Sequence, residues 1–140
     1  MRNELLDLYK VLSPFKEVHE TLKTLKENKL KLAILSNGTP SLLNELVKSN
    51  NLENLFDDIF SIEEVGVYKP NSKVYDMPVK KYKIRKDEIA FLSANTWDVS
   101  GGGNYGYQAV WVNRNNNIFD NLDFKPKLEI KNLSGLLSEL

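Results

Sequence analysis

The sequence predicts an α/β fold with a mostly parallel sheet sandwiched by helices. The first observation behind this prediction is the alternation of short apolar runs, which indicate strands, with longer amphipathic segments, which indicate helices. The second is that three connections begin at strand ends rich in Ser, Asn, Lys or Asp. Open α/β sheets carry their sites just beyond the carboxyl ends of the strands. We therefore expect these three ends to converge on one functional edge.

Composition excludes several classes of function. The 140 residues suit a single domain. Nineteen basic and nineteen acidic residues cancel, so no net field favours nucleic acid, a membrane surface or a polyanion. With no cysteine and a single histidine, His19, a disulfide framework, a thiolate site and a His-based metal cluster are excluded. For His19 we expect a surface or capping role.

The sequence contains no segment directed to a membrane. No apolar stretch approaches the roughly 18–20 residues that span a bilayer, and no signal-peptide pattern opens the chain. We therefore expect a cytoplasmic protein without a membrane or nucleic-acid partner.

Helical periodicity predicts the helices. In the helix predicted for 17–28, apolar residues recur on one face, with lysines and glutamates between them. Thr39 and Asn71 are expected N-caps, and Pro40 is a suitable first helical residue. Pro78 lies inside the fourth helix, where a missing backbone hydrogen bond should kink the helix at a cost of up to about 3 kcal/mol. The predicted helices are residues 3–12, 17–28, 40–49, 72–82, 96–105 and 133–140.

Shorter apolar runs predict the strands. The first run, interrupted only by Lys31, indicates a buried strand. The fourth run, residues 108–112, contains aromatic and β-branched residues, which favour a strand. The Asn-rich run 113–117 is predicted to be a solvated turn, and 118–127 an irregular loop. The predicted strands are residues 30–35, 57–60, 89–93, 108–112 and 128–130.

Three polar motifs stand at the expected functional edge. They read L-S-N-G-T-P (35–40), Y-K-P-N-S-K-V-Y (68–75) and F-L-S-A-N-T-W-D-V-S-G-G-G (91–103). Taken singly, each has a plain structural explanation: a capped turn, a solvated loop lysine at Lys69, or a first-turn acid at Asp98 favoured by the helix dipole. The glycines follow a helix start, so close helix–sheet packing explains them better than a phosphate cradle. The order of the motifs is more specific than any one of them.

In that order the motifs resemble the second, third and fourth motifs of the haloacid dehalogenase superfamily, and more narrowly those of the (S)-2-haloacid (L-2-haloacid) dehalogenases. The similarity runs from about Leu5, through L-S-P-F (12–15), to the terminal helix. It implies a Rossmann-like haloacid-dehalogenase core. It also implies hydrolysis of a small 2-haloalkanoic acid: an aspartate attacks C2 with inversion, and water then cleaves the aspartyl ester.

The resemblance implies catalytic roles for four residues. Lys69 would keep the nucleophilic aspartate ionised and oriented. Ser93, Asn95 and Asp98 would orient the nucleophile and the hydrolytic water, with Asp98 as the base. Phosphatase relatives carry an acid at the position of Ser93, because Mg²⁺ needs hard oxygen ligands. The serine there predicts a site without metal or other cofactor.

The resemblance also implies a binding role for four residues. Ser36 and Asn37 would hold the substrate carboxylate and help to bind the halide. Trp97 would line the halide side of the pocket. Tyr75 would lie near the lysine of the third motif.

The family's first motif, with the nucleophilic aspartate, has no counterpart in this sequence. We expect residues 1–12 to be the remnant of the last cap helix. Residues 13–140 would be an incomplete core that lacks the first strand and the cap subdomain, leaving two unpaired strand edges. An N-terminally truncated chain, a mis-assigned start codon or a split gene would explain this, and a pseudoenzyme or a fragment completed by another chain is the alternative.

Two functional hypotheses from different classes therefore stand. The first is an (S)-2-haloacid dehalogenase that is inactive as this chain alone, because nothing replaces the attacking carboxylate. The second is a non-catalytic interaction module, and a phosphatase of the same superfamily is a weaker third. Relatives are commonly homodimers, so a homodimer is a further expectation.

Overall fold

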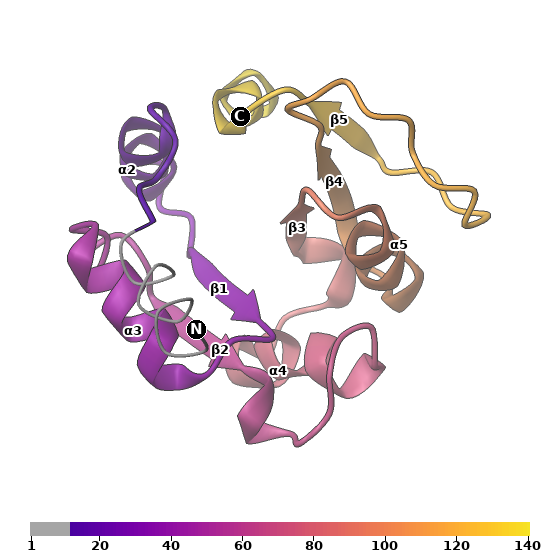
Figure 1. Ribbon diagram of the computed structural model, residues 1–140, viewed down its shortest axis with the longest axis horizontal. Helices are drawn as coiled ribbons and strands as arrows, with labels where there is room; N and C mark the ends of the chain where they lie inside the picture. Colours follow the sequence, from indigo (N-terminus) through magenta and orange to yellow (C-terminus); the bar gives the residue numbers. More distant parts are fainter. Residues whose placement is uncertain (1–11) are drawn as a thin grey trace, which may run out of the picture. The chain divides into compact units, whose positions relative to one another are not determined.

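A computed structural model describes residues 12–140 (Figure 1). Contacts divide the chain into two compact units, one ending at Glu64 and the other running from Val65 to Leu140. Helices and parallel strands alternate in both, which confirms the predicted fold class. The helix predicted for 3–12 falls on residues outside the described part, apart from Leu12. No helix in the described part is both long and apolar enough to cross a membrane.

The first unit contains a two-stranded parallel sheet. Ser36 and Ser61, the last residues of the two strands, lie opposite each other in the register. The third predicted helix begins as expected, since the Thr39 side chain accepts a hydrogen bond from the Leu42 N–H and Pro40 is the first helical residue. The elements are α2 (Val18–Glu27), β1 (Ala33–Ser36), α3 (Pro40–Ser49), β2 (Asp58–Ser61) and a 3₁₀ helix (Ile62–Glu64).

Strand β1 is shorter and less buried than the sequence predicts. It begins at Ala33, which is exposed, and its other residues are only half-buried. In the described part of the chain its only strand partner is β2. The interpretation of this run as a buried strand is wrong, because a strand that is paired on one edge alone keeps solvent access along the other.

Helix α2 is joined to its neighbours by polar contacts. The Lys26 ammonium lies 2.8 and 2.9 Å from the two carboxylate oxygens of Asp57, and the Leu32 N–H donates to the same carboxylate. Nε2 of His19 lies 2.8 Å from the carbonyl oxygen of Asn50, the C-cap of α3, so the ring donates there. This contact agrees with the capping role expected for His19.

The second unit contains a three-stranded sheet in the order β3-β4-β5, with both pairings parallel. Asn71 caps α4 by accepting from the Lys73 N–H, as predicted. Helix α4 continues through Pro78 to Tyr82. The elements are α4 (Ser72–Tyr82), a 3₁₀ helix (Lys86–Glu88), β3 (Ala90–Ser93), α5 (Thr96–Tyr105), β4 (Gln108–Val112), β5 (Leu128–Ile130) and a terminal 3₁₀ helix (Leu133–Glu139).

Strand β4 supplies core residues to both faces of this sheet. Val110 and Val112 pack with Ile130 on one face. Ala109 and Trp111 pack on the other face with Val99 of α5, where Phe119 and Phe124 join them. This alternation is that of a central strand whose two faces are both covered.

The glycines of α5 allow close packing, as the sequence predicts. A Cβ at Gly102 would lie 2.5 Å from Cδ1 of Phe91 on β3, and one at Gly101 would lie 2.5 Å from the Tyr75 hydroxyl oxygen on α4. Neither approach is compatible with a side chain larger than hydrogen. The interpretation of these glycines as packing residues is confirmed.

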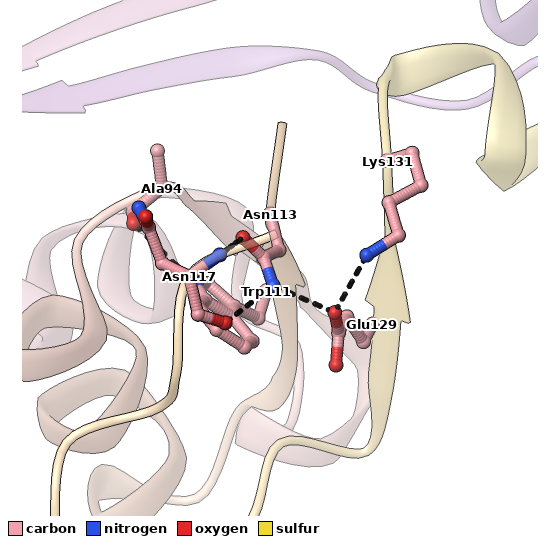
Figure 2. Close-up of polar contacts among 6 residues, drawn as sticks. All are labelled: Ala94, Trp111, Asn113, Asn117, Glu129 and Lys131. Atoms are coloured by element: carbon pink, nitrogen blue, oxygen red, sulfur yellow. Dashed lines mark hydrogen bonds and ion pairs between the residues drawn. The ribbon is translucent and has the colours of Figure 1, made fainter. Parts of the chain in front are cut away.

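The turn after β4 differs from the prediction. Asn113, predicted to be solvated, is 3% exposed. Its side-chain carbonyl accepts from the Asn117 N–H at 2.8 Å, and its amide donates to the Asn117 carbonyl and to Glu129 at 3.0 and 2.7 Å (Figure 2). The prediction is wrong for this residue, because protein groups replace water as the partners of the amide.

Candidate active site

The centre of the candidate site is the carboxylate of Asp98, in the first turn of α5. It is 3% exposed. The Lys69 ammonium lies 2.7 Å from Oδ2, and the Tyr75 hydroxyl donates to Oδ1 at 2.9 Å. The structure therefore brings together Lys69, Tyr75 and Asp98, which come from the second and third of the polar motifs.

Both charges of this ion pair are buried, so each is compensated mainly by the other. The side chains of Lys69 and Asp98 are 8% and 4% exposed, so neither charge is well solvated and each depends on the other. Burial raises the pKa of Tyr75 far above its ordinary range, and the charge and hydrogen bond of Asp98 raise it further. Tyr75 therefore remains protonated and acts as a donor to the carboxylate.

An aromatic cluster fixes the orientation of Tyr75. The side chain is fully buried, and its ring meets those of Phe91 and Tyr107 edge-on, at centroid distances of 5.6 and 6.0 Å. The Tyr107 hydroxyl donates to the Tyr75 carbonyl oxygen. The Lys69 ammonium lies 5.6 Å from the Phe91 ring centroid. The two donors to Asp98 are thus held by packing as well as by the carboxylate.

The residues between β3 and α5 form a tight turn. Ser93 Oγ accepts from the Asn95 N–H at 3.2 Å, and the indole N–H of Trp111 donates to the Ala94 carbonyl at 3.2 Å. The side chain of Asn95 is exposed and makes no capping hydrogen bond to α5, although the residue occupies the N-cap position. Trp97 is 41% exposed. Asn95 and Trp97 are therefore open to a ligand, whereas Asp98 faces inward.

The remaining site candidates, Ser36 and Asn37, lie in the first unit. They are half-buried at the end of β1. Ser36 Oγ accepts from the Gly38 N–H at 3.0 Å, and the Ser61 hydroxyl donates to the Gly38 carbonyl at 2.8 Å. The structure gives these two residues a defined turn at a strand end, which is where the sequence predicts a binding loop.

Sequence reasoning missed the residues that support these groups: Ser61, Tyr107 and Trp111. Each donates a hydrogen bond to a backbone carbonyl of a segment that carries candidate site residues. Ser61 had a readable signal, because it is a polar residue at the end of a predicted strand, like Ser36 and Ser93. The two aromatic residues had none, because their apolar character already explains their burial.

This arrangement suits the activation of water by a carboxylate. A carboxylate has about four acceptor positions, so the donors Lys69 and Tyr75 leave room for a water molecule to donate to Asp98. Among residues 12–140, no three or more His, Cys, Asp or Glu side chains are grouped so that they could hold a metal ion.

Open α/β sheets carry their sites at such strand ends, whatever the chemistry they perform. The model of the haloacid dehalogenase-like hydrolase family matches residues 1–112, and the chain belongs to this family. The resemblance inferred from the three motifs is thereby confirmed.

Several of the similar proteins are dehalogenases. The chain is 37% identical over 136 residues to the (S)-2-haloacid dehalogenase of Pseudomonas sp. (strain YL), a match that covers 97% of the chain and 59% of that enzyme. A crystal structure of an L-2-haloacid dehalogenase matches with a TM-score of 0.94 at 33% identity, over 98% of this chain and 60% of that one.

A third match shows such an enzyme in a covalent complex. It is an L-2-haloacid dehalogenase from Xanthobacter autotrophicus with chloropropionic acid covalently bound. The TM-score is 0.87 at 26% identity, over 94% of this chain and 62% of that one. The chain thus spans about three fifths of the length of the relatives that it matches.

Proposed function

We propose that this protein is an (S)-2-haloacid dehalogenase, which converts a small (S)-2-haloalkanoic acid into the (R)-2-hydroxyacid through an aspartyl ester. The observation that carries the proposal is the buried Asp98 carboxylate with Lys69 and Tyr75 as its donors. Ser93, in place of a second acid, supports a dehalogenase over a metal-dependent phosphatase. Similarity to dehalogenases along 97% of the chain supports it as well.

The proposed reaction has two displacement steps. A carboxylate oxygen of a nucleophilic aspartate attacks C2, and the carbon–halogen bond breaks as halide leaves with its electron pair, inverting C2. Water then adds to the ester carbonyl while Asp98 accepts its proton. The bond between the ester carbonyl carbon and the C2 oxygen breaks, and Asp98 returns its proton to that oxygen, which releases the hydroxyacid and restores the aspartate. The covalent chloropropionate complex of the Xanthobacter relative supports such an intermediate.

Substrate recognition is proposed for the two strand-end turns. The amide of Asn37 and the hydroxyl of Ser36 are neutral donors suited to a monoanionic carboxylate and to halide. The exposed edge of the Trp97 indole is suited to a polarisable leaving halide. Ser93 and Asn95 would orient the nucleophile and the water.

In this scheme the chain supplies the half of the site that activates water. Asp98 is assigned to the water and not to C2, because it is 3% exposed and both oxygens already accept a hydrogen bond. The sequence has no counterpart of the family's first motif. We therefore propose that residues 1–140 alone do not catalyse dehalogenation.

The test is halide release from (S)- and (R)-2-chloropropionate. The 140-residue chain would be assayed alone and together with the first-motif segment of an (S)-2-haloacid dehalogenase. We expect no release by the chain alone, release from the (S) substrate when the segment is present, and loss of that release with Asp98→Asn.

Each arm can contradict a different part of the proposal. Chloride release by the chain alone would overturn the assignment of Asp98 as water base only. A folded, supplemented chain that releases no chloride from either enantiomer would overturn the dehalogenase function itself.

A non-catalytic interaction module is the second candidate. The observation in its favour is that β1 and β3 each pair with one strand only among the described residues. The edge of a sheet can recruit a strand from another chain. This candidate is tested by measuring the association state of the chain in solution.

A further inference from the structure

The turns at the ends of β1 and β3 are built alike. In each, the last residue of the strand is a serine whose hydroxyl oxygen accepts from the backbone N–H two residues later. The distances are 3.0 Å from Ser36 Oγ to the Gly38 N and 3.2 Å from Ser93 Oγ to the Asn95 N. These two turns contain four of the candidate site residues.

Each turn is also held from the adjacent strand, and by the residue opposite the serine in the register. Ser61 pairs with Ser36 and donates to the Gly38 carbonyl at 2.8 Å. Trp111 pairs with Ser93 and donates from its indole to the Ala94 carbonyl at 3.2 Å (Figure 2). The two donors are chemically unrelated, and the carbonyls that accept from them lie two residues after Ser36 and one residue after Ser93.

Both donors are immobilised by their surroundings. Ser61 is 1% exposed, and its oxygen also accepts from the Glu63 N–H at 3.3 Å. Trp111 is buried against Val99, and the Phe119 ring meets its indole edge-on at 5.0 Å and 86°.

The segment 113–127 keeps this packing in place around Trp111. Asn113 ties its beginning to Asn117 and, through Glu129, to β5 (Figure 2). Further along, the Asp120 carboxylate accepts from the Thr96 hydroxyl in the first turn of α5. The ring of Phe119 lies between these two attachments, so it is held against the indole.

We propose that Ser61 and Trp111 are positioning residues for the two active-site turns. Trp111 fixes the peptide plane between Ala94 and Asn95, and Ser61 fixes the plane between Gly38 and Thr39, one residue after Asn37. Each hydrogen bond thereby restricts the backbone of the turn that carries the asparagine. The inference rests on the proposed function, because the turns need this precision only if their side chains meet substrate. Groups that stabilise a transition state must be held in place before the reaction.

The test is amide hydrogen exchange by NMR on the full 140-residue chain and its variants Ser61→Ala and Trp111→Phe. We expect Trp111→Phe to speed exchange of the Asn95 N–H about tenfold, as for loss of one buried hydrogen bond, and to leave Gly38 unchanged. Ser61→Ala should do the reverse. Each variant is the matched control of the other.

Two further measurements cover a variant that fails to fold. In the unmodified chain, the indole N–H of Trp111 should exchange at least tenfold more slowly than that of Trp97, which is exposed. Ser61→Thr keeps the hydroxyl and should retain the protection of Gly38.

The expected pattern is reciprocal and local, so three results would overturn the proposal. These are unchanged exchange at both turns, acceleration spread evenly over the core amides of β2 and β4, and equal exchange of the two indoles. None of these readouts needs turnover. A chain that shows the reciprocal pattern but releases no halide when supplemented would retain the positioning role and lose the dehalogenase function.

Discussion

At the scale of single residues, Lys69 and Asp98 form a buried ion pair in the second unit. A buried carboxylate is tolerated here because an ammonium and a phenol compensate for lost hydration. The same three groups are those that the proposed reaction needs. Stability and chemistry therefore depend on one contact, and a substitution that removes a partner affects both.

Lys69→Met should lower the free energy of unfolding by about 3–5 kcal/mol, since it leaves the Asp98 charge buried without its cation. Urea unfolding followed by circular dichroism measures this. The double variant Lys69→Met/Asp98→Asn should recover part of the loss, because no lone charge remains.

The matched control for this change is Lys80→Met. Lys80 pairs with Asp76 at 2.6 Å, but its side chain is largely exposed, so its loss should cost less than about 1 kcal/mol. Equal losses for the two lysine variants would contradict the view that burial makes the Lys69 pair important.

At the scale of elements, one carboxylate joins α2 to the segments that lead into β1 and β2. Asp57 receives Lys26 from the helix and the Leu32 N–H from the residue before β1. The hydrogen bond from Lys26, followed by that from Leu32, holds the pKa of Asp57 below its usual 3.8. This contact makes the docking of α2 dependent on pH.

The sign of that dependence follows from the lowered pKa. The stabilisation is fully present above about pH 4, the ordinary range of an unfolded aspartate. It is lost as pH falls through the lower pKa of the folded state. We expect Asp57→Asn to reduce the melting temperature at pH 7 and to flatten its decline between pH 5 and pH 3. Thermal melts of both proteins across this range measure it, and parallel curves would contradict it.

At the scale of the whole molecule, the interaction-module candidate predicts association through the edges of the two sheets. Among the described residues, β1 pairs only with β2, and β3 only with β4. Edge strands without protection pair with other chains. We expect the 140-residue chain to elute ahead of a 16.1 kDa monomer on a sizing column, checked by light scattering.

Dilution provides the control for edge pairing. If strand edges hold copies of the chain together, the apparent mass should fall towards 16.1 kDa as the chain is diluted. A compact monomer at all concentrations would count against the interaction module as a second candidate.

The sequence by itself determined the elements whose signals are local. The bounds of α5, β4 and β5 follow from periodicity, and the starts of α3 and α4 from Thr39 and Asn71, whose side chains need only nearby N–H groups. The order of the three motifs was also sufficient to identify the family, because motif order is a property of the sequence and does not depend on how the chain packs.

Only the tertiary structure decided the contacts between segments far apart in the sequence. Burial of Asn113, exposure of Ala33, and the hydrogen bonds of Ser61 and Trp111 to the two turns depend on which strands are neighbours and in what register. An isolated serine or tryptophan has the same local preference whether or not a carbonyl lies opposite. The sequence could therefore name the residues of the candidate site, but the partners that hold them were decided by strand pairing.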